Sequence, residues 1–267
     1  MVGLAGPIRG FCSRSRSLED FNEKFKKNIL EDTINDFLKL RKNVRVLEIG
    51  CGEGRVLMQL RKLYPEIEIH GINKKPWSAM KGKNSLKRTG TYYKIFSHSE
   101  INKVDLPRIH FYDAQKLDFE DKYFDVVYSQ VSIYQVKRKD LLLEEVWRVL
   151  KKDGRAYLHI DTYHDKYPDF LKGETPRFII YKDDEPYKFK TLINNLKKED
   201  YNLKVKSSVE TRDSLDNHRI HLIMHKNKDA KLSLGLKFDE LSSFRLDDLK
   251  LEVDNSKIVG YRSVYRL

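Results

Sequence analysis

The chain of 267 residues lacks the features that mark several large protein classes. Its two cysteines, Cys12 and Cys51, cannot form a disulfide framework or a metal cage of their own. No apolar run approaches the ~20 residues that a membrane-spanning helix needs. These absences argue against a disulfide-rich secreted protein and a membrane protein. We therefore expect a cytoplasmic protein, in a reducing compartment and without a metal site.

Acidic residues are missing from the N-terminal part of the chain. None precedes Glu19, whereas Arg9, Arg14 and Arg16 all lie before it. This composition could suit a mitochondrial transit peptide, but residues 1–17 show no clear amphipathic repeat. A short basic N-terminal arm is the favoured interpretation.

A second acid-free stretch lies between Asn73 and Ser99 and contains seven bases. Aromatic residues are interleaved with these bases, namely Trp77, Tyr92, Tyr93 and Phe96. Such a segment can hold a phosphate, a carboxylate or a nucleic-acid backbone. A solvated helix with its aromatics facing the core would have the same composition. The overall net charge of +12 decides little, because 34% of the residues are charged and lysine is scattered along the chain.

The most informative motif is a glycine-rich turn after an apolar stretch, Val-Arg-Val-Leu-Glu-Ile-Gly-Cys-Gly-Glu-Gly at residues 44–54. The apolar part is typical of a buried parallel strand. Glycines at 50, 52 and 54 permit a sharp turn and let a ligand approach the backbone. A helix is predicted to follow and to end before Pro65. In α/β domains this arrangement binds nucleotide-like ligands at the carboxyl edge of a sheet.

Two common nucleotide-binding motifs are excluded. A dinucleotide fingerprint starting at Gly50 needs glycine or alanine at position 55, which is Arg55. A phosphate-binding P-loop needs Gly-Lys-Ser/Thr after four spacer residues, and this is absent. The remaining pattern, an acid followed by three alternating glycines from Glu48 to Gly54, resembles motif I of the class I S-adenosylmethionine-dependent methyltransferases.

Later segments are similar to the same family and follow in the same order. The apolar segment 67–72 ends in Asn73, where the family usually has an acid that binds both ribose hydroxyls. The segment 108–112 ends in Asp113-Ala114, which resembles the motif that contacts the adenine amino group. The run 144–154 closely resembles the fifth-helix signature of the small-molecule branch.

The resemblance covers about residues 20–226 and implies a fold. We expect an α/β protein with a Rossmann-like, doubly wound seven-stranded sheet whose last strand is antiparallel, plus a C-terminal extension. Residues 1–43 would form an N-terminal arm and a cover helix, with one amphipathic helix over 18–40. Residues 44–226 would form the cofactor-binding domain. Residues 227–267 would form the extension, as a hairpin packed on the core.

The resemblance also implies S-adenosylmethionine as the cofactor. It would be held at the strand ends by Glu48, Gly50, Cys51, Gly52, Asn73, Asp113, Ala114, Ser129 and Gln130. Asn73 departs from the family, because a neutral amide lacks the charge-assisted hydrogen bonding of a carboxylate. We therefore expect weaker cofactor binding than an acid at this position would give.

Methyl transfer from a sulfonium requires alignment and, for some acceptors, removal of a proton. The candidate base is His164, after the fifth strand, and Tyr134, after the fourth, would orient the acceptor. His159 and Asp161 are further candidates that share a strand face by alternation. His159 equally suits a packed position in the sheet.

The leading interpretation is an enzyme that transfers a methyl group to an oxygen or nitrogen of a small metabolite, which the sequence allows to be neutral or anionic. Ser129-Gln-Val-Ser132 replaces the Asn/Asp-Pro-Pro-Tyr/Phe motif of DNA amino-group methylation, and no Pro-Cys pair exists for cytosine C5 methylation. One alternative is an RNA methyltransferase that uses residues 74–96 to bind RNA. Another is a protein that binds S-adenosylmethionine without turnover. No membrane partner is expected, and the sequence leaves the oligomeric state open.

Overall fold

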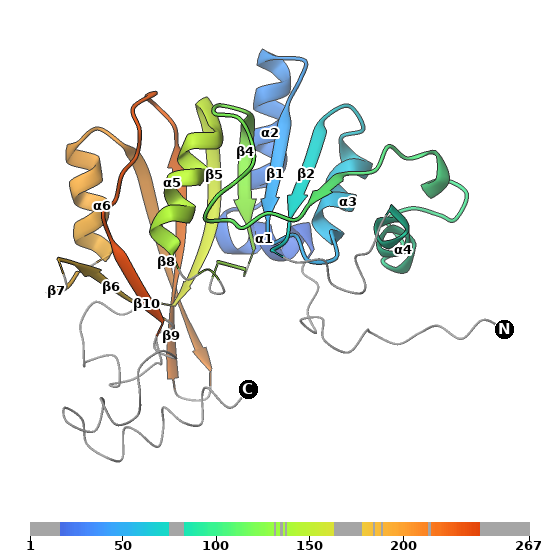
Figure 1. The fold of residues 1–267 in the computed structure, drawn as a ribbon. Coiled ribbons are helices and arrows are strands. Elements are labelled where there is room, and N and C mark those ends of the chain that lie inside the picture. Colours follow the sequence, from blue (N-terminus) through green and yellow to red (C-terminus); the bar gives the residue numbers. More distant parts are fainter. Residues whose placement is uncertain are drawn as a thin grey trace.

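A computed structural model describes residues 17–74, 83–130, 132–133, 136, 138–162, 178–183, 185–187, 189–212 and 215–240. Within these ranges the centre of the molecule is a seven-stranded sheet of order β3-β2-β1-β4-β5-β9-β8 (Figure 1). The strands are β1 (Arg45–Ile49), β2 (Glu68–Ile72), β3 (Arg108–His110), β4 (Phe124–Ser129), β5 (Leu150–Thr162), β8 (Asn202–Arg212) and β9 (Leu215–His225).

The first five strands of this sheet pair in parallel, and β9 runs antiparallel to both its neighbours, β5 and β8. This topology confirms the predicted Rossmann-like, doubly wound sheet with an antiparallel strand near its end. Because the strand order reverses direction at β1, the carboxyl ends of β1 and β4 lie where such sheets bind ligands.

Helices cover both faces of the sheet (Figure 1). On one face, α1 (Leu18–Phe25), α2 (Ile29–Leu40) and α3 (Arg55–Leu63) share an apolar core with β1, β2 and β4. On the other face, α5 (Lys139–Val149) and α6 (Phe189–Lys198) pack against β4, β5 and β9. The helix α4 (Lys83–Tyr92) and the 3-10 helix η2 (Ile101–Lys103) form a smaller cluster beside α3.

The predicted single helix over 18–40 is wrong in its continuity, because it is divided into α1 and α2. The division falls at Lys26–Asn28, where Lys26 is extended and Asn28 has a left-handed φ of 58°. Asn tolerates this region better than most residues. A capping box of Ser17 and Asp20 starts α1 and satisfies backbone donors there. The apolar face is nevertheless buried, as the sequence pattern indicated.

A second, three-stranded sheet was not predicted. It pairs β6 (Phe178–Lys182) with β7 (Glu185–Pro186) and with β10 (Lys237–Glu240), all antiparallel. Leu232, Leu234 and Leu236, just before β10, are buried in the core beside α5 and α6. The hairpin predicted in the C-terminal extension lies outside the described residues.

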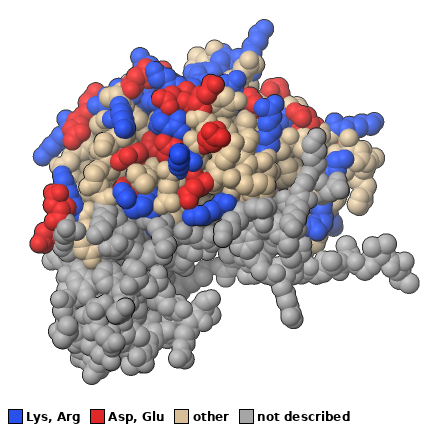
Figure 2. All heavy atoms as spheres, viewed as in Figure 1, with Lys and Arg blue, Asp and Glu red and all other residues tan. Residues whose placement is uncertain are grey.

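The surface shown in Figure 2 carries acidic and basic side chains interspersed, so the positive net charge is not gathered in one patch on this face. Among the described helices, none is long and apolar enough to cross a membrane.

Candidate cofactor site

The glycine turn between β1 and α3 has the conformation that its sequence demands. Gly50, Gly52 and Gly54 all have positive φ angles, of 69°, 53° and 76°. Side chains with a Cβ rarely adopt this region, which explains the alternating glycines. The carbonyl oxygen of Ile72 in β2 accepts hydrogen bonds from the amides of Gly50 (2.9 Å) and Cys51 (3.1 Å). The turn is therefore tied to the neighbouring strand.

Gly50 and Gly52 differ in what surrounds them. A Cβ atom added to Gly50 would lie 2.2 Å from Cβ of Ser132, so the space beside Gly50 is filled by the protein itself. A Cβ atom added to Gly52 would meet no heavy atom within 4 Å in the part of the chain that the structure describes. Gly52 therefore presents its backbone to open space, where a ligand can approach.

The end of β4 is fastened to the start of the turn by two serines. The hydroxyls of Ser129 and Ser132 both donate to the carbonyl oxygen of Ile49, at 3.1 and 2.8 Å, and lie 2.8 Å from each other. Ser132 was not among the predicted site residues. The repeat of a serine three residues after Ser129 was the signal that could have indicated it.

Gln130 follows Ser129 directly and is only 8% exposed. Its Nε2 atom is buried and has no hydrogen-bond partner among the described residues. A buried donor without an acceptor costs about 1–3 kcal/mol, which a bound ligand can offset by supplying an acceptor. Gln130 is thus suited to bind a polar ligand at the end of β4.

Glu48 lies in β1 just before the turn and is buried. The hydroxyl of Tyr128, its neighbour in β4, donates to Glu48 Oε2 at 3.0 Å. Burial raises the pKa of Glu48 to about 8, against the opposing effect of this hydrogen bond. The carboxyl group is therefore largely protonated at neutral pH. Burial, together with Glu48, also raises the pKa of the Cys51 thiol.

Asn73, at the end of β2, is 6% exposed and is bonded to the turn. Its Oδ1 accepts from the amide of Gly52 at 3.0 Å, while its Nδ2 donates to the carbonyl oxygen of Gly52 at 3.2 Å and to Sγ of Cys51 at 3.3 Å. The predicted site residues at the ends of β1 and β2 are therefore brought into direct contact.

Asp113 follows β3 and is linked to the same region through Lys74. Lys74 Nζ lies 2.8 Å from Asp113 Oδ2, and Gln115 donates to Oδ1 through its backbone and side-chain nitrogens at 3.0 and 2.9 Å. Although burial opposes it, these partners hold the pKa of Asp113 below its ordinary value. Ala114 is buried beside it. Lys74 was not predicted as a site residue. Its position directly after Asn73, the predicted ribose-binding residue at the end of β2, was a signal in the sequence that could have indicated it.

The predicted catalytic pair, His164 and Tyr134, lies outside the described residues. His159 is buried in β5, where its ring stacks on His221 of β9 with centroids 4.9 Å apart. The ring of Phe25 from α1 covers His221 at 5.0 Å. His159 thus occupies a packed sheet position. The pairing of β5 with β9 is irregular between His159 and Asp161, so the strict alternation behind their predicted shared face is interrupted.

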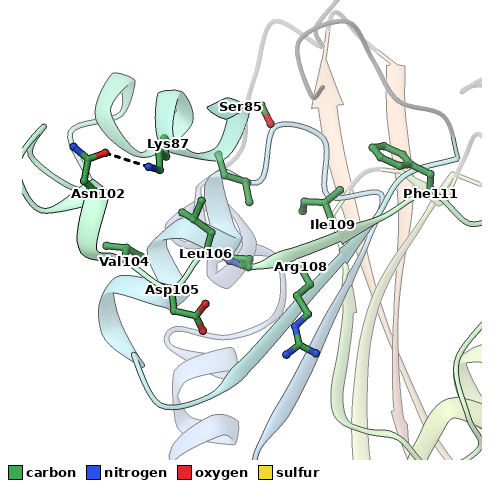
Figure 3. Close-up of a pocket in the computed structure, with 11 residues that line it drawn as sticks. Ser85, Lys87, Asn102, Val104, Asp105, Leu106, Arg108, Ile109 and Phe111 are labelled. Atoms are coloured by element: carbon green, nitrogen blue, oxygen red, sulfur yellow. Dashed lines mark hydrogen bonds between the residues drawn. The ribbon is translucent and has the colours of Figure 1, made fainter. Parts of the chain in front are cut away.

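A separate groove of about 680 Å³ lies between α4 and the edge strand β3 (Figure 3). Its apolar lining includes Leu86, Leu106 and Ile109. Lys87 and Arg108 also line it, and Phe111 is 41% exposed there. Lys87 Nζ is held by Asn102 Oδ1 at 3.1 Å. The groove therefore combines an exposed aromatic ring with two basic side chains and the carboxylate of Asp105.

Residues 40–211, more than half of the chain, match a protein family described as "Methyltransferase domain". Sterol 4-C-methyltransferase from Caenorhabditis elegans is 29% identical over 126 residues, 47% of this chain and 34% of that protein. Ribosomal RNA small subunit methyltransferase G from Streptococcus agalactiae is 30% identical over 111 residues, 41% of this chain and 40% of that protein. The matches thus span less than half the length of these curated relatives.

A solved structure has the same fold. The arsenic(III) S-adenosylmethionine methyltransferase from Chlamydomonas reinhardtii superimposes with a TM-score of 0.50 at 18% identity, over 70% of this chain and 64% of that one. The sheet order, the glycine turn and the family match agree with one another. The chain belongs to the class I S-adenosylmethionine-dependent methyltransferase family.

Proposed function

We propose that this chain transfers a methyl group from S-adenosylmethionine to an oxygen or nitrogen of a small acceptor, neutral or anionic. The observation that carries the proposal is the buried Nε2 of Gln130, a donor without a partner among the described residues. It directly follows Ser129, which is bonded to the residue before the glycine turn. A ligand with a hydroxyl or carboxylate acceptor would satisfy it.

The described residues fit the cofactor. The open space at Gly52 permits close approach to the backbone, and Gln130 offers a buried donor. We assign cofactor binding to Glu48, Gly50, Cys51, Gly52, Asn73, Asp113, Ala114, Ser129 and Gln130. When bound, S-adenosylmethionine supplies a methyl group already activated on a sulfonium. The protein then has to align the acceptor and exclude water.

Proton removal from a hydroxyl or amine acceptor is assigned to His164, with Tyr134 orienting the acceptor. Support for this assignment comes from their sequence positions after β5 and β4, two neighbouring parallel strands whose carboxyl ends lie at the same edge of the sheet as the carboxyl end of β1. A histidine near its ordinary pKa can accept such a proton at neutral pH. The variant His164→Ala should turn over at least tenfold more slowly than the wild type with the identified acceptor. Unchanged turnover would remove His164 from this role.

The substrate class is tested with methyl-labelled S-adenosylmethionine and a cell extract divided into metabolite and RNA fractions. We expect label in the metabolite fraction, with stoichiometric release of S-adenosylhomocysteine. Two names among the similar proteins, the sterol and arsenic(III) methyltransferases, support a small acceptor. If no fraction is labelled although the cofactor binds, the chain is a non-catalytic S-adenosylmethionine-binding protein.

RNA methylation is the second candidate function. The groove beside α4 favours it, because the exposed ring of Phe111 can stack on a base while Lys87 on α4 contacts a phosphate (Figure 3). The similarity to a ribosomal RNA methyltransferase points the same way. Binding of transfer or ribosomal RNA that weakens steeply with salt, together with label in the RNA fraction, would favour this function over the first.

A further inference from the structure

We infer that Asn73 is a positioning residue for the glycine turn, and that this role explains why an amide stands where the family usually has an acid. The inference deepens the proposed function, because it concerns the cofactor site. It rests on the pairing of the Asn73 side chain with the backbone of Gly52, which the free protein already contains.

The contact is a two-way pairing of one amide with one residue's backbone. Asn73 Oδ1 accepts the Gly52 N–H at 3.0 Å, and Asn73 Nδ2 donates to the Gly52 carbonyl at 3.2 Å. The backbone N–H of Asn73 in turn donates to the carbonyl of His110 in β3 at 3.1 Å. One residue thus connects the turn after β1 to the ends of β2 and β3.

This pairing limits what Asn73 can offer a ribose. A side-chain amide has two N–H donors and two acceptor lone pairs. Both donors are used within the protein, on Gly52 and Cys51, and one lone pair is used by the Gly52 amide. Asn73 therefore has at most one lone pair for a ribose hydroxyl while it holds the turn. It cannot accept both ribose hydroxyls as a carboxylate can.

A carboxylate could not replace the amide in this contact. Aspartate at position 73 would still accept the Gly52 N–H, but it has no donor for the Gly52 carbonyl or for Cys51. Its second oxygen would face the Gly52 carbonyl oxygen at about the present 3.2 Å. Asn73→Asp should therefore loosen the turn, and any gain at the ribose is offset by this loss.

The first test needs no ligand. Hydrogen exchange at the Gly52 amide is measured by NMR in the full free chain, for the wild type, Asn73→Ala and Asn73→Asp. Loss of the acceptor in Asn73→Ala should speed exchange about tenfold, since a net hydrogen bond of up to about 1.5 kcal/mol is removed. Asn43→Ala, which removes an exposed amide before β1, is the matched control and should leave Gly52 unchanged. An unchanged rate in Asn73→Ala overturns the inference.

The second test separates positioning from ribose binding. Dissociation constants of S-adenosylhomocysteine and its 2′-deoxy and 3′-deoxy analogues are measured for the wild type and Asn73→Ala. A positioning residue predicts the same fold-loss for all three ligands. If the main role of Asn73 is to bind a ribose hydroxyl, Asn73→Ala should weaken binding of the analogue that lacks this hydroxyl more than fivefold less than it weakens binding of S-adenosylhomocysteine. That result would overturn the inference. If the wild type binds none of these ligands, the proposed function fails, while the exchange experiment still decides the role of Asn73.

Discussion

At the scale of single residues, Glu48 gives the protein a characteristic pH dependence. Its pKa is raised from an ordinary value of 4.5 to about 8 by burial, so the folded chain holds a proton that the unfolded chain has released. The contribution of Glu48 to the free energy of unfolding is fully present below pH 4.5 and is lost as the pH rises through about 8. We predict a loss of up to about 5 kcal/mol across this window.

Glu48→Gln removes the titrating proton and keeps an acceptor for the Tyr128 hydroxyl. Urea unfolding from pH 5 to pH 8.5 should therefore show a weaker decline in the free energy of unfolding for the variant than for the wild type. Parallel declines in the two proteins would mean that Glu48 ionises normally in the folded state.

Gly50 and Gly52 make a matched pair for backbone strain. Both have positive φ, but only Gly50 would place its new Cβ against Ser132, at 2.2 Å. Gly50→Ala should lower the free energy of unfolding by about 2–4 kcal/mol, from strain and overpacking together. Gly52→Ala should cost only about 1 kcal/mol, from strain alone. Chemical denaturation compares them, and equal losses would contradict the packing of Ser132 over Gly50.

The residues of the cofactor site differ in how well the sequence predicts them. The three glycines could be predicted because glycine, which has no Cβ, is the residue type that readily adopts positive φ and allows close approach to the backbone. The pairing of Asn73 with Gly52 could not, because it depends on the register that places Ile49 opposite Ile72. Lys74 and Ser132 stand beside predicted site residues in the sequence, but their partners, Asp113 and Ile49, are known only from the folded structure.

At the scale of elements, the family-like run 144–154, which begins in α5, has a structural role. The Arg148 side chain donates five hydrogen bonds, two to Glu145 in the same helix and three to the segment between β3 and β4, at Asp121 and the carbonyls of Leu117 and Phe119. Glu145 also accepts the backbone amide of Leu117 at 2.7 Å. The helix therefore fixes the loop between β3 and β4, which begins near Asp113.

We predict that Arg148→Met lowers the free energy of unfolding by about 2 kcal/mol, because carbonyls and Glu145 lose their donors. Arg148→Lys should recover less than half of this, since a lysine cannot reproduce the planar fork. Arg108→Met is the matched control, because this exposed arginine in β3 pairs with Glu68 at the surface, and it should cost less than about 0.5 kcal/mol. Thermal unfolding measures all three; equal effects of Arg148→Met and Arg108→Met would contradict the assigned role.

The central strands and helices follow from local periodicity, which is why the sequence predicted them. The break between α1 and α2 contains no glycine or proline that would predict it; it is made by the extended backbone of Lys26 and the left-handed backbone of Asn28. The short strands β6, β7 and β10 have no periodicity to detect. β6 and β7 form a local hairpin with only two paired positions, and β10 joins β6 from a segment far away in the sequence, which no local pattern records.

At the scale of the whole molecule, the segment after β9 contributes to the core. Leu232, Leu234 and Leu236 are buried there, and Trp147 Nε1 donates to the carbonyl of Ala230 at 2.8 Å. The predicted domain boundary at residue 226 leaves these contacts outside the cofactor-binding domain. Truncation of the chain tests this boundary. A chain ending at 226 should lose about 5 kcal/mol or more from the leucines and the orphaned indole, enough to prevent folding.

A chain ending at residue 240 is the matched control, because it keeps these contacts and β10. Circular dichroism and thermal unfolding should find the 240-residue chain folded and the 226-residue chain unfolded. Equal stability of the two truncated chains would show that residues 227–240 are not part of the folded core.

The most direct test of the central claim, that the glycine turn binds S-adenosylmethionine, is calorimetric titration of S-adenosylhomocysteine into the wild type and Gly52→Ala. The account predicts saturable binding of one ligand per wild-type chain. It also predicts at least tenfold weaker binding to a folded Gly52→Ala, whose new methyl group occupies the open space at the turn. No binding to the wild type, or equal affinity of the two proteins, would contradict it.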